Sequence, residues 1–185
     1  APKFHPAMKH AVGPRKELGQ RTIFNVLGPL TNPAGASQQL IGVYDPALTE
    51  TIAKVFGELG GVAAFVVHGH GGLDELTTTG PNRVSHLKDG KVTTFELDSE
   101  SLGLRRAGPG DLKGGSPEEN AQIMRQVLSG EMDGALKDVV LLNAAAAIAA
   151  DSGDLAGGLA EARQSLESGA ALAKMEKLVE FSQKV

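Results

Sequence analysis

The chain has 185 residues, 41% of them apolar and 22% charged, and a formal net charge of −4. Length and composition are ordinary for one globular domain with a buried core, and the negative charge argues against nucleic acid or an acidic membrane as a partner. The sequence has no cysteine, which excludes disulfides, thiolate metal sites and a cysteine nucleophile, and fits the reducing cytoplasm.

The N-terminal part is expected to be helical and then irregular. Residues 1–18 predict one helix that breaks or ends near Gly13 and Pro14, because a proline disfavours helical backbone at the preceding residue. Residues 21–33 contain two pairs in which a glycine or asparagine precedes proline, so we predict an irregular, stiffened segment there. The N-terminus has no apolar stretch of the kind found in signal peptides.

The next segment predicts a strand, a helix and a second strand. Residues 39–44 are apolar and β-branched, as in a strand, and Asp45 and Pro46 follow as a helix N-cap and first-turn proline. Apolar residues then recur at helical spacing until Gly60. Residues 62–68 are apolar throughout, as expected for a strand covered on both faces. This order predicts a βαβ unit with a parallel strand pair.

A hairpin is predicted further along the chain. Residues 83–87 and 91–97 alternate in polarity around Asp89 and Gly90, the residue types of a tight hairpin turn. We expect this pair to form an antiparallel edge of the sheet.

The C-terminal third predicts helices. Ser116, Pro117 and Glu119 combine an N-cap, a first-turn proline and a capping-box glutamate. Residues 139–150 are apolar except for Asn143, too short a run to span a bilayer, and predict a central buried helix. The side chains expected on the buried faces of the other helices are Ile123, Met124, Val127 and Leu128, then Leu155, Leu159, Ala162 and Leu166, then Leu172, Met175 and Val179. The predicted class is α/β, with a mixed, mainly parallel sheet flanked by helices.

The strongest candidate site directly follows the second predicted strand. Residues 68–75 read HGHGGLDE, and ligands of open α/β sheets bind beyond the carboxyl ends of the strands. Asp74 and Glu75 offer the oxygen ligands that Mg²⁺ prefers. Residues 68–75 also permit other interpretations. The segment fits a glycine-rich turn with two solvated acids, and a transition-metal site would use His68 and His70 but lacks an obvious third histidine. A dinucleotide fingerprint is excluded because Asp74 stands where its third glycine would fall.

Arg15 is the second candidate. A guanidinium offers two parallel donors to a planar carboxylate and stays protonated. An arginine on a helix face is also commonly just solvated, and the residue alone does not decide between the two.

Several collinear blocks resemble one family. They are residues 4–10 (FHPAMKH), 15–25 (RKELGQRTIFN), 27–33 (LGPLTNP), 66–76 (VVHGHGGLDEL), 112–115 (LKGG), 119–120 (EN) and 141–145 (LLNAA). Together they resemble the anthranilate phosphoribosyltransferases of tryptophan biosynthesis, which transfer phosphoribosyl from 5-phosphoribosyl-1-pyrophosphate to anthranilate and release pyrophosphate.

The resemblance implies the fold shared by the α/β domains of nucleoside phosphorylases and phosphoribosyltransferases, a cytoplasmic enzyme that uses Mg²⁺, and a parent protein that is a homodimer. Asp74 and Glu75 match the family's Mg²⁺-binding acidic pair, and Arg15 matches its anthranilate-binding arginine. Residues 5–8 match the region near the anthranilate access path, and residues 25–33 the link between two domains.

The resemblance begins in the middle of the family pattern. Its Gly-Thr-Gly-Gly-Asp loop, which holds pyrophosphate, its Lys-His-Gly-Asn-Arg segment and most of its helical domain have no counterpart in these 185 residues. The resemblance therefore implies that residues 1–185 are the C-terminal part of the α/β domain. We expect this part alone to have little or no transferase activity, and the N-terminal part of the same protein to be a partner.

Two alternatives stay open. One is an enzyme of the same architecture with another substrate, such as a pyrimidine nucleoside phosphorylase. The other is a non-catalytic binding or assembly module that has kept the fold.

Overall fold

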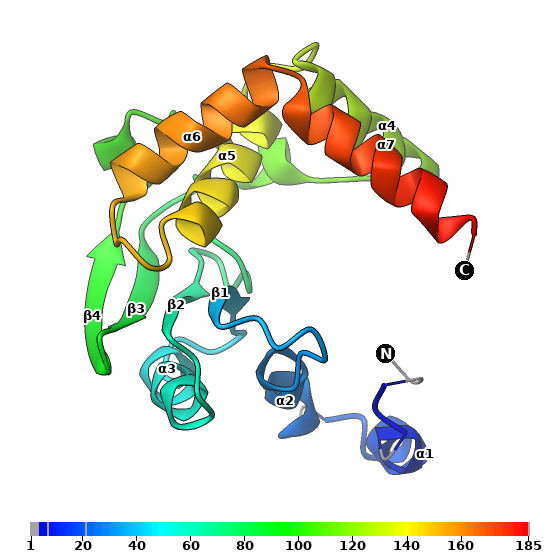
Figure 1. Cartoon of the computed structure of the whole chain (residues 1–185), viewed down its shortest axis with the longest axis vertical. Helices are drawn as coiled ribbons and strands as arrows, with labels where there is room; N and C mark the ends of the chain where they lie inside the picture. The colour runs from blue at the N-terminus through cyan, green and yellow to red at the C-terminus, as the bar shows by residue number, and fades with distance from the viewer. Residues whose placement is uncertain (1–3, 7, 21, 185) are drawn as a thin grey trace.

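A computed structural model describes residues 4–6, 8–20 and 22–184 and contains a mixed sheet (Figure 1). Within the described residues the sheet has four strands in the order β1-β2-β3-β4. They are β1 (Gln38–Gly42), β2 (Ala63–His68), β3 (Asn82–Lys88) and β4 (Lys91–Leu97). β1 and β2 are parallel, whereas β3 pairs antiparallel with both β2 and β4. The α/β class and the mixed sheet are confirmed, but parallel pairing is confined to β1 and β2.

The predicted βαβ unit is confirmed by β1, α3 (Leu48–Glu58) and β2. Successive side chains of a strand point to opposite faces. Ala64 and Val66 accordingly pack with α3, while Phe65 and Val67 join the cluster formed with α5 and α6. Because both faces are covered, β2 is apolar along its length, as the sequence indicated.

Four helices make up the C-terminal part, together with two short 3₁₀ turns that precede it. The turns are η1 (Ser99–Leu102) and η2 (Pro109–Leu112), and the helices are α4 (Pro117–Ser129), α5 (Ala135–Ile148), α6 (Leu155–Glu167) and α7 (Ala170–Ser182). Figure 1 shows α5 and α6 over the sheet, and α4 and α7 side by side beyond it. No helix in the described part of the chain is long and apolar enough to cross a membrane.

The two N-terminal helices differ from the prediction. α1 (Met8–Leu18) continues through Pro14, and α2 (Phe24–Leu30) replaces part of the expected irregular segment and includes Pro29. Each proline follows a glycine, which has no Cβ to clash with the proline ring, so helical backbone is less costly there than for another residue. α1 has no buried residue and lies apart from the sheet (Figure 1). Residues 1–3 and 7 of the expected first helix, and residue 21, lie outside the described residues.

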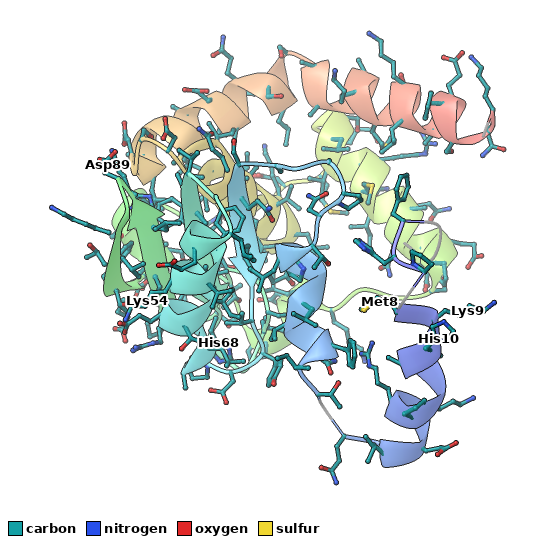
Figure 2. The ribbon with its side chains drawn as sticks, turned by 60° about the horizontal axis from the view of Figure 1, so that its bottom comes forward. Met8, Lys9, His10, Lys54, His68 and Asp89 are labelled. Atoms are coloured by element: carbon teal, nitrogen blue, oxygen red, sulfur yellow. The ribbon has the colours of Figure 1, made fainter. Side chains whose placement is uncertain are left out.

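Of the local predictions for turn and capping residues, two are confirmed and one is wrong. The hairpin turn is confirmed by Asp89 and Gly90, both with positive φ, and Figure 2 shows Asp89 at the tip of this hairpin. Ser116 forms the predicted capping box with Glu119. Asp45 does not cap α3. The helix begins at Leu48, and the Asp45 carboxylate instead accepts from the Ala47 N–H in the preceding turn.

The predicted buried face is confirmed for Leu159, Ala162 and Leu166 of α6 and for Val127 of α4, but not for α7, in which no residue is buried. Met124 of α4 is 53% exposed and Val179 of α7 is 43% exposed. Helical spacing places these two side chains on apolar faces, but no described neighbour covers them fully.

Candidate functional site

The acidic loop lies where β1 and β2 end. Gly42 is the last residue of β1, and a Cβ placed there would overlap the Asp74 carbonyl group. A Cβ on Gly69, directly after β2, would overlap the Glu75 carbonyl oxygen. The two glycines therefore let the loop backbone fold back against the carboxyl ends of the parallel strands, where the sequence placed the site.

Hydrogen bonds fix the backbone on both sides of Asp74 and Glu75. The Gly69 N–H donates to the Leu73 carbonyl at 2.8 Å before the acidic pair. After the pair, the Asn143 carboxamide binds both backbone groups of Leu76, at 3.0 and 2.8 Å. The loop is therefore a tied segment of irregular backbone rather than a loose turn.

Asp74 and Glu75 are exposed to solvent on this tied backbone. Within the described residues neither carboxylate has a hydrogen-bond or ion-pair partner. Their oxygens are free to accept a ligand.

A hollow of about 360 Å³ lies beside the loop. Its lining consists of His70, Gly71, Leu73, Glu75, Thr79, Pro109, Leu112 and Lys113. One acidic residue, Glu75, and one basic residue, Lys113, thus line the same hollow. A cation bound to the carboxylate and a phosphate near the ammonium would both be compatible with this lining.

The oxygen ligands fit Mg²⁺ better than a transition metal. No group of three or more histidine, aspartate or glutamate side chains is placed to hold a metal ion in the described part of the chain. Mg²⁺ tolerates this because it keeps several waters and shares substrate phosphates, so two protein carboxylates can suffice.

One ring nitrogen of each histidine of the loop already has a hydrogen-bond partner. Nδ1 of His68 lies 2.9 Å from the Val43 carbonyl oxygen, and Nδ1 of His70 lies 3.2 Å from the Thr79 hydroxyl. Figure 2 shows His68 on the sheet side of the molecule and His10 on α1 at the other side. The arrangement therefore gives no support to the transition-metal alternative.

Arg15 lines a second, larger hollow of about 630 Å³ between α1 and α2. Most of the lining is apolar: Phe4, Met8, Val12, Pro29 and Pro33 are among its residues. The Arg15 guanidinium is half-buried and lies 5.8 Å from the centre of the Phe24 ring. Apolar walls with one guanidinium suit a flat molecule that carries a carboxylate.

The hollow also includes part of the predicted access region. His5 and Met8 line it, whereas residue 7 lies outside the described residues. The hollows of Arg15 and Glu75 have no lining residue in common among the described residues. The structure thus places Glu75 in one hollow, with Asp74 next to it in the loop, and Arg15 in a different hollow.

Three residues at the site were not singled out from the sequence. Asn143 and Asn82 hold the loop backbone, and Lys113 lines the hollow beside it. Asn143 did carry a signal, because a polar side chain in an otherwise apolar helix needs a partner. Lys113 carried only its place in the block 112–115, one of those that resemble the family.

Proteins of known sequence resemble this chain along nearly its whole length. The sequence model described as "Glycosyl transferase family, a/b domain" matches residues 1–172. Anthranilate phosphoribosyltransferases from Roseiflexus castenholzii and Moorella thermoacetica are 56% and 55% identical to this chain, over 98% and 97% of its length. The alignments cover 54% and 53% of those proteins, so the chain spans about half the length of the curated relatives it matches.

Solved structures of anthranilate phosphoribosyltransferases resemble the fold of this chain. Anthranilate phosphoribosyltransferase from Thermus thermophilus matches with a TM-score of 0.88 and 46% identity, over 96% of this chain and 53% of that one. The Saccharomyces cerevisiae enzyme in complex with PRPP and Mg matches with a TM-score of 0.89 and 33% identity, over 100% of this chain and 54% of that one. By these matches the chain belongs to the glycosyl transferase family, whose α/β-domain model matches residues 1–172.

Proposed function

We propose that this chain is the C-terminal part of an anthranilate phosphoribosyltransferase. Relatives above 50% identity with that name carry the proposal, because they match along nearly the whole chain. The Saccharomyces cerevisiae relative was solved with PRPP and Mg, and also with 4-fluoroanthranilate. The proposed reaction is attack of the anthranilate amine on C1 of 5-phosphoribosyl-1-pyrophosphate. A carbon–nitrogen bond forms, the carbon–oxygen bond to pyrophosphate breaks, and the amine loses a proton.

In this proposal Arg15 binds the anthranilate carboxylate. The apolar walls of its hollow would hold the aromatic ring, and the guanidinium would set the direction of the amine. Its contribution to the rate is orientation of the acceptor, not proton transfer.

Asp74 and Glu75 are proposed to hold Mg²⁺. A bound Mg²⁺ supplies positive charge that offsets the charge developing on departing pyrophosphate. The residues of this chain contribute exposed carboxylate oxygens on a backbone that hydrogen bonds hold in place.

The proposed activity belongs to a longer protein. The alignments cover about 54% of the relatives, and the backbone donors that hold pyrophosphate in the family pattern would come from the part that precedes this chain. We further propose that the whole protein is a cytoplasmic homodimer and that its N-terminal part packs with this chain.

Steady-state kinetics of the whole protein tests the proposal. We expect Mg²⁺-dependent formation of phosphoribosyl-anthranilate, and Asp74→Asn or Glu75→Gln to lower kcat/KM by about 100-fold, within the range typical for loss of charge stabilisation in a transition state. The purified 185-residue chain should give little or no turnover.

Other results would contradict the proposal. Thymidine phosphorolysis without anthranilate transfer would point to a nucleoside phosphorylase. Absence of both activities in the whole protein, together with no response to Mg²⁺ or anthranilate, would favour a binding module. Full turnover by the chain alone would show that no preceding part is needed.

A further inference from the structure

Asn143 of α5 directs its carboxamide at the acidic loop. Its Nδ2 donates to the Leu76 carbonyl at 2.8 Å, and its Oδ1 accepts from the Leu76 N–H at 3.0 Å. The second hydrogen of Nδ2 is used within the helix, on the Val139 carbonyl at 2.9 Å. Leu76 is fully buried and directly follows Glu75. The carboxamide therefore binds both polar groups of the residue next to the acidic pair.

The Asn143 carboxamide binds Leu76 as the backbone of a neighbouring strand would. Buried backbone groups need partners, and the loop offers no β-ladder at this point. Asn82 of β3 does the same for the next residue, since its Oδ1 accepts from the Thr77 N–H at 2.8 Å and its Nδ2 donates to the Thr77 carbonyl at 2.9 Å. Two consecutive residues are thus each bound by a side-chain amide, one from a helix and one from a strand.

The acidic side chains depend on this backbone for their direction. Because neither the Asp74 nor the Glu75 carboxylate has a partner among the described residues, no side-chain contact holds it in place. What is tied is the backbone on both sides of the pair, at Leu73 by Gly69 and at Leu76 by Asn143. Of these ties, the one made by Asn143 is adjacent to Glu75.

We propose that Asn143 is a positioning residue for the Asp74–Glu75 cation site. Through both backbone groups of Leu76 it holds the two carboxylates in one arrangement before a cation binds. The inference rests on the proposed metal-binding role of the pair. Residues that orient metal ligands commonly change metal affinity by about 10–100-fold when they are replaced, although they do not touch the metal.

Two substitutions of Asn143 remove both or only one of its hydrogen bonds to Leu76. Asn143→Leu keeps a similar volume and removes both. Asn143→Asp keeps an acceptor for the Leu76 N–H, removes the donor to its carbonyl, and is the variant to use if the leucine variant does not fold. Asp154→Ala is a matched control, because it removes a helix cap on the Gly157 N–H of α6 and leaves the loop bonds intact.

Hydrogen exchange of backbone amides and Mn²⁺ titration of the purified 185-residue chain provide the readouts. In Asn143→Leu we expect the Leu76 amide to exchange at least about tenfold faster relative to the amides of β3, because its acceptor is lost. We expect the Mn²⁺ dissociation constant to rise by about tenfold or more. Asn143→Asp should fall between this variant and the original chain, and Asp154→Ala should change neither quantity.

Each outcome bears on the inference. Unchanged Leu76 exchange in folded Asn143→Leu would overturn it. So would faster exchange with unchanged Mn²⁺ affinity, because Asn143 would then only stabilise the loop. Failure of the proposed metal role is recognised separately, since Asp74→Asn and Glu75→Gln would then leave Mn²⁺ binding unchanged or the original chain would bind none. In either case an Asn143 role in positioning a cation site is rejected, even if the exchange result shows that it holds the loop.

Discussion

Gly42 lets the acidic loop approach the end of β1 closely. Its missing side chain leaves room for the Asp74 carbonyl group, which belongs to backbone and cannot rotate away. We expect Gly42→Ala to lower the free energy of unfolding by about 1–3 kcal/mol, as overpacking generally does. The same shift of Asp74 should weaken Mn²⁺ binding. Urea unfolding and Mn²⁺ titration measure the two effects.

Gly110→Ala is the matched control for this change. A Cβ on Gly110 meets nothing within 4 Å, and its φ is not in the left-handed region. It should therefore alter neither stability nor Mn²⁺ affinity by much. Equal effects of the two substitutions would show that the close approach of Gly42 and Asp74 has no particular importance.

Arg15 permits a test of acceptor binding. In the whole protein, Arg15→Ala should raise the KM for anthranilate by roughly 10–100-fold, because hydrogen bonds to charged groups contribute about 1.5–3 kcal/mol. The KM for 5-phosphoribosyl-1-pyrophosphate should change little. Lys16→Ala, the adjacent and exposed cation, is the control. If both variants kept the original KM for anthranilate, the carboxylate role of Arg15 would be wrong.

At the scale of single residues, the sequence indicated where the acidic loop lies, and its role as a cation site stays a prediction. Two adjacent carboxylates after a buried strand pointed to a cation site, and the structure places them at the strand ends as expected. The bonds of Asn143 could not be predicted, since its partner Leu76 lies 67 residues away. A local pattern can show that a buried amide needs a partner, but not which backbone supplies it.

At the scale of elements, the βαβ unit and the hairpin followed from periodicity and turn residues. The helices around Pro14 and Pro29 did not, because the general effect of proline was applied without the glycine that precedes each one. Apolar stripes predicted which helix faces are apolar. They could not predict that Leu178 and Phe181 of α7 would be 66% and 63% exposed, because exposure depends on which neighbours are present.

The capping box of α4 makes this element sensitive to pH. The Ser116 N–H, which donates to the Glu119 carboxylate, holds the pKa of that carboxyl below its ordinary value of 4.5. A lowered pKa in the folded state contributes stability above the unfolded pKa, and that contribution disappears as the pH falls through the folded pKa.

We expect Ser116→Ala to cost about 1 kcal/mol at neutral pH through loss of the N-cap. Glu119→Gln should destabilise the chain at neutral pH and reduce the loss of stability on acidification. Urea unfolding, monitored by circular dichroism from neutral pH to below the pKa of Glu119, measures the stability of each variant and its dependence on pH. A Glu119→Gln variant with the same pH dependence as the original chain would contradict the role of this carboxylate.

At the scale of the whole molecule, the sequence predicted the α/β class and the flanking helices. The structure adds the order of the strands, β1-β2-β3-β4. The separation of the two hollows was not predictable. It depends on where α1 and α2 lie relative to the sheet (Figure 1), and no periodicity in the sequence encodes that placement. In the proposed enzyme, the acceptor and the cation would be held by different parts of the chain and brought to one reaction centre.

The span of 67 residues between Leu76 and Asn143 also has a consequence for the order of folding. The hairpin of β3 and β4 joins residues close in sequence, whereas the tie to Leu76 needs α5 to lie against the loop. Contacts between distant residues carry a larger loop-closure cost and tend to form late. In refolding experiments, the ability to bind a cation should therefore be gained with the docking of α5, after most strand pairing is complete.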